Sequence, residues 1–141
     1  MNPRDFLKVA TKLSKGGTTA EYRTAISRAY YAAYNVGVEL LEGMGCAISK
    51  SAAGHEQLSS NFNNSEDLEL SKISTQLNDL RSKRNIADYR LERTEIENQK
   101  NSQAIVMQAE KMIKFLDRSI TGPRRDKIAK SISEYRKKIG H

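Results

Sequence analysis

The chain has little of what small folds use besides a hydrophobic core. Cys46 is its only cysteine, so no intramolecular disulfide can form, which suits a reducing compartment. No run approaches the roughly 18 apolar residues of a membrane-spanning helix, and the N-terminus lacks the apolar core of a secretion signal. We therefore predict a cytoplasmic protein that does not enter a membrane. With 141 residues, it is long enough for one domain that folds without metals or disulfides.

Strand signals are also scarce, because the chain has two prolines, little alternation and few clustered β-branched residues. Helical periodicity is present instead over most of the length. The first helix is predicted to begin with Asn2 as N-cap and Pro3 in the first turn, and to end at Gly16-Gly17. Thr18 or Thr19 then caps a second helix that ends near Gly43.

The second predicted helix carries the small residues Ala29, Ala33 and Gly37 on its apolar stripe. Small residues allow a second backbone to approach closely, so this stripe favours helix pairing and gives some support for a homodimer. Residues 43–54 are rich in glycine and small polar residues and predict a flexible loop.

Three further helices follow, after a short helical piece at 56–62. Residues 63–65 are predicted to break and cap the chain before a helix that runs to Tyr89 or Leu91. Thr94 and Glu97 have the spacing of a capping box and predict the start of the next helix, which Gly122-Pro123 ends. Long helices joined by short loops predict an all-α, up-and-down antiparallel bundle over residues 1–121. Residues 122–141 are predicted to add an amphipathic, basic C-terminal helix, with one apolar face: Ile128, Ile132, Tyr135 and Ile139.

The net charge of +7 is concentrated in that C-terminal helix. Two acids, Asp126 and Glu134, accompany its seven basic residues, so residues 122–141 carry +5 and the first 121 residues only +2. Such a segment indicates an anionic partner such as nucleic acid, or else a solvated face that keeps a small domain soluble. The basic residues of this tail are Arg124, Arg125, Lys127, Lys130, Arg136, Lys137 and Lys138.

One arginine interrupts an apolar stripe. The helix that precedes residue 90 has apolar residues at spacings of three and four: Leu70, Ile73, Leu77 and Leu80. The same spacing leads next to Arg84 and Ala87, so a guanidinium occupies a position in the helix seam. Burying an unpaired guanidinium is costly, so Arg84 needs a carboxylate such as Asp88, one turn away, or a polar cleft that takes an anion. Arg81 and Asn85 are predicted to form a neighbouring one-turn pair.

The second helix offers a polar set that could face this arginine. It consists of Arg23, Ser27, Arg28, Tyr31 and Asn35. The same helix holds four of the six tyrosines, which serve as core packing or as a stacking platform for bases. The two histidines, His55 and His141, are far apart and have no Cys or His near them, so no metal site is predicted, and no glycine-rich phosphate loop or other cofactor motif is present.

Two segments together resemble the HEPN domains of prokaryotes. Residues 25–34 are similar to the Ser-Arg-x-Tyr-Tyr-Ala helix common in that family, and residues 80–89 resemble its Leu-Arg-x-x-Arg-x-x-Ala-Asp-Tyr element. The resemblance covers roughly residues 3–120 and implies a dimerising helical bundle. Many members are ribonucleases or toxins of defence and toxin–antitoxin systems, often encoded beside a small nucleotidyltransferase.

The resemblance also implies roles for single residues. Catalytic members carry an arginine followed a few residues later by a histidine, in a cleft that two copies share. Arg84 matches the arginine and Asn85 the polar residue after it, but Asp88 and Tyr89 stand where the histidine would fall. Related members have a motif tyrosine that a partner nucleotidyltransferase modifies, a role that would fall to Tyr89.

Three functions follow as alternatives. The first is an RNA- or nucleotide-binding homodimer in a defence or toxin–antitoxin pair, with a site formed by Arg84, Asn85, Asp88, Tyr89, Arg28, Tyr31 and Arg81 and helped by the basic tail. The second is a metal-independent ribonuclease toxin in which Arg84 acts with Asp88 or His55 as substitute base. The third is a scaffold that binds a nucleotidyltransferase, an antitoxin or another protein through the tyrosine-rich helix and the C-terminal helix.

Overall fold

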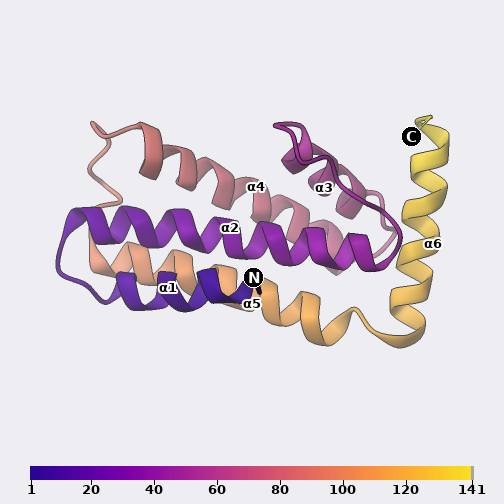
Figure 1. The fold of residues 1–141 in the computed structure, drawn as a ribbon, viewed down its shortest axis with the longest axis horizontal. Helices are drawn as coiled ribbons and strands as arrows, with labels where there is room; N and C mark the ends of the chain where they lie inside the picture. The colour runs from indigo at the N-terminus through magenta and orange to yellow at the C-terminus, as the bar shows by residue number, and fades with distance from the viewer. Residues whose placement is uncertain (141) are drawn as a thin grey trace.

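The computed structural model describes residues 1–140, and all of its regular structure is α-helical (Figure 1). The predicted all-α class is therefore confirmed. Within residues 1–140 no helix combines the length and the apolar character that crossing a bilayer requires. The helices are α1 (Arg4–Ser14), α2 (Thr19–Gly43), α3 (Gly54–Asn63), α4 (Leu68–Tyr89), α5 (Gln99–Ser119) and α6 (Gly122–Lys138).

Helix α2 is the centre of the bundle. Helices α1, α4 and α5 all pack along it, and α1 and α4 run antiparallel to it (Figure 1). The short helix α3 lies on α4, and α6 crosses the end of the bundle at which α2 finishes. The up-and-down bundle predicted from the loop lengths is thus the observed architecture.

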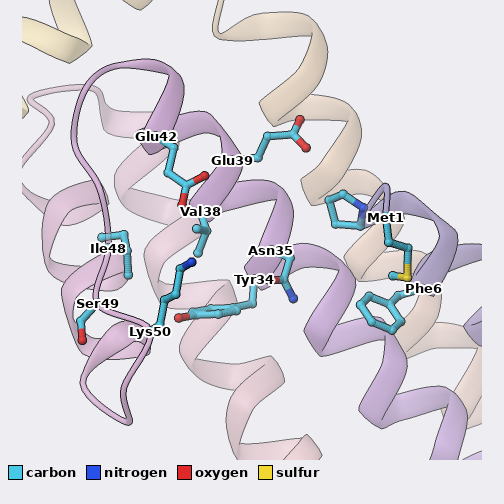
Figure 2. Close-up of a pocket in the computed structure, with 11 residues that line it drawn as sticks. Met1, Phe6, Tyr34, Asn35, Val38, Glu39, Glu42, Ile48, Ser49 and Lys50 are labelled. Carbon is cyan, nitrogen blue, oxygen red and sulfur yellow. The ribbon is translucent and has the colours of Figure 1, made fainter.

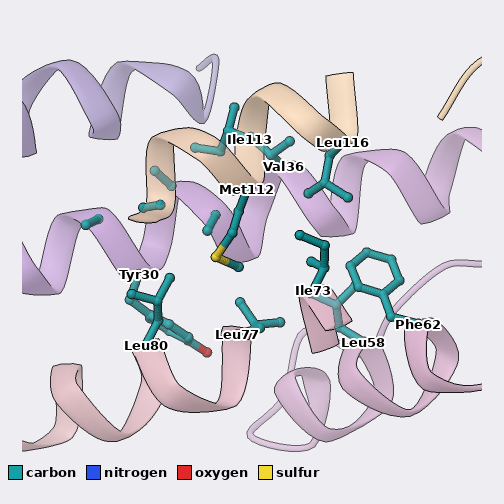
Figure 3. Packing of buried hydrophobic residues seen from close by; sticks show 14 of the residues in the cluster. Tyr30, Val36, Leu58, Phe62, Ile73, Leu77, Leu80, Met112, Ile113 and Leu116 are labelled. Carbon is teal, nitrogen blue, oxygen red and sulfur yellow. The ribbon is translucent and has the colours of Figure 1, made fainter. Parts of the chain in front are cut away.

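The core fills the space between α2 and the helices around it (Figure 3). The small-residue stripe of α2 lies inside it: Ala29 and Ala33 are buried, and an added Cβ at Gly37 would meet Leu58 and Phe62 of α3. These small residues therefore serve packing within one chain. The support that they gave to a homodimer is withdrawn, because the surface is already covered.

The N-terminal ends of α1 and α2 are set by the capping side chains that the sequence predicts there, whereas that of α4 is not. Asn2 accepts a hydrogen bond from the backbone N–H of Arg4 at 3.0 Å, although α1 proper begins one residue later than predicted. Thr18 caps α2 and forms a reciprocal capping box with Glu21. The segment 63–65 does not cap α4, because the carboxylate of Asp67 accepts from the N–H of Leu70.

The capping box predicted at Thr94 and Glu97 is wrong. These residues lie in turns, and α5 begins at Gln99 with Asn98 as its N-cap. The carboxylate of Glu97 binds the guanidinium of Arg23 instead. A charge-assisted bond to a buried guanidinium is stronger than a bond to a backbone N–H, so the tertiary partner prevails over the local cap.

Helix α6 is fixed to the bundle by its apolar face. Ile128 and Ile132 are almost fully buried, and the Tyr135 hydroxyl lies 2.5 Å from that of Ser60 on α3. Ile139 remains exposed, and His141, the end of the predicted range, lies outside the described residues. Because most of this face is used within the chain, it is not open for a partner protein to dock on as the scaffold alternative requires.

Candidate functional site

The sequence-predicted site residues of α2 and α4 come together around Tyr31. Its hydroxyl accepts a hydrogen bond from Nη2 of Arg84 at 2.8 Å. We call the group formed by Arg28, Tyr31, Arg84, Asp88 and Tyr89 the arginine–tyrosine cluster. It lies where the last turns of α4 pass the middle of α2.

Arg84 is held by aromatic rings more than by a carboxylate. Its side chain is only 15 % exposed, and its Nε lies 3.7 Å from Asp88 Oδ2, beyond hydrogen-bonding distance. The guanidinium carbon lies 5.1 Å from the centre of the Tyr31 ring, 5.4 Å from that of Tyr30 and 5.7 Å from that of Tyr89. Within residues 1–140 the Nε–H has no hydrogen-bond partner and is shielded from solvent. Each terminal nitrogen uses one N–H, on Asn85 or Tyr31, so each keeps a second N–H that can bind an anion.

Arg28 provides a second guanidinium beside the first. Its guanidinium carbon lies 4.8 Å from the centre of the Tyr31 ring and 5.4 Å from that of Phe6. Its Nη2 donates to the Ser27 hydroxyl, which in turn donates to Asp88 at 3.1 Å. Two cations therefore share one tyrosine ring, with a single carboxylate close to them.

Two predicted members behave differently. Arg81 does not pair with Asn85 but forms an ion pair with Glu56 of α3, and its charge acts on Tyr30 and His55. Asn85 accepts from Nη1 of Arg84 at 2.8 Å and is exposed. Asn85 thus belongs to the cluster's edge, whereas Arg81 links α4 to α3.

Arg23, which was predicted to belong to the polar set of α2 that faces Arg84, has a different place. It is 8 % exposed, and its guanidinium lies at the C-terminal end of α4, where it donates to backbone carbonyls. The role of Arg23 is structural, because capping those carbonyls consumes its donors.

His55 was named as a possible substitute base beside Arg84, but nothing in its sequence surroundings predicted its contact with Tyr30. Its Nδ1 accepts from the Tyr30 hydroxyl at 2.7 Å, and its Nε2 donates to Asn78 Oδ1 at 2.8 Å. Burial lowers the pKa of His55 and raises the pKa of Tyr30 to about 12, so both groups are neutral at pH 7. His55 therefore fixes the ring of Tyr30, which packs against Arg84.

The burial of His55 makes the free energy of unfolding depend on pH. Burial lowers the pKa of His55, and the charges of Arg81 and Arg84 lower it further. The hydrogen bond to Asn78 and the charge of Glu56 raise the pKa, but by less. The folded protein therefore keeps His55 neutral to lower pH than the unfolded chain does. The stabilisation is complete above about pH 6.5, the ordinary imidazole value, and falls as the unfolded chain takes up the proton below it. We expect urea unfolding to show lower stability at pH 5.5 than at pH 7.5, and a smaller difference in His55→Gln.

Tyr30→Phe is the control for this pH dependence, since it removes the hydroxyl and keeps the buried imidazole. Its pH profile should retain the slope of the wild type. An equal acid loss in wild type and His55→Gln would show that His55 does not cause it.

The basic tail lies away from the cluster. Arg124 binds the carboxylates of Asp67 and Glu69, and Arg136 donates to the carbonyl of Ala47. Since Asp67 and Arg84 are 17 residues apart on α4, roughly 25 Å of helix separate the start of α6 from Arg84. Arg125 is half-buried at the start of α6, and the remaining members are exposed: Lys127, Lys130, Lys137 and Lys138. One chain therefore does not join tail and cluster into one surface.

Neither a metal site nor a known relative indicates what this site does. Among residues 1–140, no three His, Cys, Asp or Glu side chains gather in a way that could hold a metal ion. Comparison of the chain with protein-family models, with curated proteins and with solved structures found no match.

Proposed function

We propose that this chain is an RNA- or nucleotide-binding module of the HEPN type, and that the arginine–tyrosine cluster is its binding surface. The observation that carries the proposal is Arg84, a guanidinium in a helix seam that is stacked on tyrosines and keeps a second N–H on each terminal nitrogen for a ligand. A site of this composition suits a ligand that has both phosphates and flat bases.

The aromatic residues favour single-stranded over double-stranded RNA. Tyr89 is 70 % exposed at the edge of the cluster and is the ring that offers a face to a base, because the Tyr31 ring already lies against two guanidiniums. Unpaired bases can stack on such rings, whereas the bases of a duplex are covered by their neighbours.

Binding is supported over cleavage. A ribonuclease of this kind needs a group that takes the proton of the 2′-hydroxyl near neutral pH. Both ring nitrogens of His55 are engaged in hydrogen bonds, and the side chain is buried behind Tyr30. His55 is therefore unsuited to serve as the substitute base.

The resemblance extends the proposal to a homodimer that works in a prokaryotic defence or toxin–antitoxin pair, with a nucleotidyltransferase or an antitoxin as partner. Exposed apolar side chains at Tyr89 and Leu91 support an interface beside the cluster.

Salt dependence of RNA binding tests this function. We expect purified protein to bind a labelled single-stranded RNA with an affinity that falls steeply as salt rises, because bound cations displace counterions from phosphates. A duplex of the same sequence should bind more weakly, and neither RNA should be cleaved in the presence of EDTA.

A variant that lacks the exposed lysines of α6 shows whether the tail contributes to the salt dependence of RNA binding. Changing Lys127, Lys130, Lys137 and Lys138 to alanine should flatten the salt dependence if the tail also contacts phosphates. No binding of either RNA at low salt would exclude the proposed function. Cleavage of the RNA would replace it by the ribonuclease alternative.

A further inference from the structure

Figure 2 shows the lining of a hollow of about 460 Å³ that lies beside the arginine–tyrosine cluster. It lies between the N-terminal residues, α2 and the segment 44–53 that joins α2 to α3. Phe6 links the two places, since its ring lines the hollow and also lies 5.4 Å from the guanidinium carbon of Arg28. A ligand in the hollow would therefore extend directly toward the cluster.

Helix α2 forms a continuous floor under both. Arg28 and Tyr31 are followed at spacings of three and four by Asn35, Val38 and Glu42, so all five lie on one side of the helix. The last three line the hollow. The volume is within the range of small-molecule pockets, and its size suits one base rather than a folded partner.

The walls of the hollow are aromatic and apolar on more than one side. Phe6, Val38 and Ile48 line it together with Tyr34. The Tyr34 ring is fixed by stacking on Tyr30, with ring centres 5.8 Å apart and an interplanar angle of 21°. Such walls bind a flat heterocycle.

Two uncompensated charges of opposite sign face the same space. Glu39 is neutralised by Arg4, whose Nη2 lies 3.1 Å from its carboxylate. Glu42 and Lys50 form no ion pair within residues 1–140, and in Figure 2 their charged ends lie on either side of Val38. The hollow thus offers one carboxylate acceptor and one ammonium donor, each without a partner.

We propose that this hollow binds a guanine base, whose phosphate lies on Arg28 and Arg84. Guanine presents O6 and N7 as acceptors for Lys50. It alone among the four bases can give one carboxylate two parallel N–H bonds, from N1 and N2, and Glu42 is the lining carboxylate without an ion pair that would accept them. The ligand is a guanine nucleotide, either free or within a single-stranded RNA, and this inference rests on the proposed function.

The test is a calorimetric titration with the four nucleoside 5′-monophosphates. Guanosine 5′-monophosphate should bind at least about tenfold more tightly than the other three. Glu42→Gln and Lys50→Met should each reduce this preference, while Lys72→Met, an exposed lysine on α4 without an ion pair in residues 1–140, should leave it unchanged. Circular dichroism of each variant shows whether the helices are intact.

A second titration separates the two sources of the base. Single-stranded RNAs with and without guanosine are compared in the same variants. A guanosine preference that Glu42→Gln removes supports the inference, and its presence with RNA but not with the monophosphate assigns the site to RNA. Equal binding of all bases, or a preference that survives Glu42→Gln, overturns the guanine site and leaves the RNA-binding function standing. Absence of all nucleotide and RNA binding overturns both.

Discussion

Arg23→Ala is expected to lower the free energy of unfolding by about 3 kcal/mol or more, the usual scale for breaking a buried ion pair. The guanidinium is buried and its Nε lies 3.1 Å from Glu97. Its two terminal nitrogens donate to five backbone carbonyls at and beyond the end of α4, those of Ile86, Ala87, Arg90, Leu91 and Arg93. Alanine would remove this donor from the carboxylate and from all five carbonyls, of which those of Ile86 and Arg90 also accept from backbone N–H groups.

Urea unfolding followed by circular dichroism measures this loss, and thermal unfolding should show a fall in Tm of about 10 °C. Arg23→Lys should recover only part of the stability, because an ammonium cannot reproduce the planar fork. Arg90→Ala is the matched control: Arg90 is exposed and its only ion pair within residues 1–140 is with Glu92. A loss below 1 kcal/mol for Arg23→Ala would mean that water replaces the guanidinium at little cost.

Arg84→Ala should weaken binding of single-stranded RNA about tenfold to a hundredfold at low salt, on the scale of 1–3 kcal/mol found for stacking and charge contacts. The substitution removes the guanidinium that we propose to bind phosphate and that lies against the rings of Tyr31 and Tyr89. Fluorescence anisotropy with a labelled RNA measures the change, and the slope against salt should also become less steep.

Two further variants separate charge from geometry at this site. Arg84→Lys keeps the charge and should recover only part of the affinity, because lysine lacks the flat guanidinium that stacks. Arg118→Ala removes one exposed cation from α5, so it controls for net charge alone. Equal affinities of Arg84→Ala and Arg118→Ala would contradict a specific role for Arg84, provided that urea unfolding shows both variants folded.

Several features of the fold were predictable because they are set by residues near one another in the chain. The reciprocal bonds of Thr18 and Glu21 span three residues, and the seam of α4 follows from its apolar spacing. The same logic failed at Thr94 and Glu97, where the local spacing was right but Glu97 binds Arg23, 74 residues away. A capping box is a local preference of about 1 kcal/mol, so a stronger distant partner can override it.

The candidate site also has parts that the sequence predicted and parts that only the structure revealed. The position of Arg84 in an apolar seam was visible in the sequence, as was the polar side of α2 that includes Arg28 and Tyr31. His55 was named only as a possible base, and its partners were not predictable, because only the packing of α3 against α2 and α4 brings it to Tyr30 and Asn78. The hollow beside Phe6 was not visible either, since the N-terminal residues enclose it together with α2 and the segment that follows α2.

The sequence by itself determined the helical class, the order of the helices and the anomalous arginine, because apolar spacing and caps act within one or two turns. Only the tertiary structure decided which partners each arginine has. Arg84 interrupts the apolar stripe of its helix and Arg23 lies off the stripe of its own, yet Arg23 caps the end of α4 while Arg84 rests on tyrosine rings. The physical reason is that spacing along a helix fixes the face on which a charge lies, whereas its partner comes from whichever distant element packs against that face.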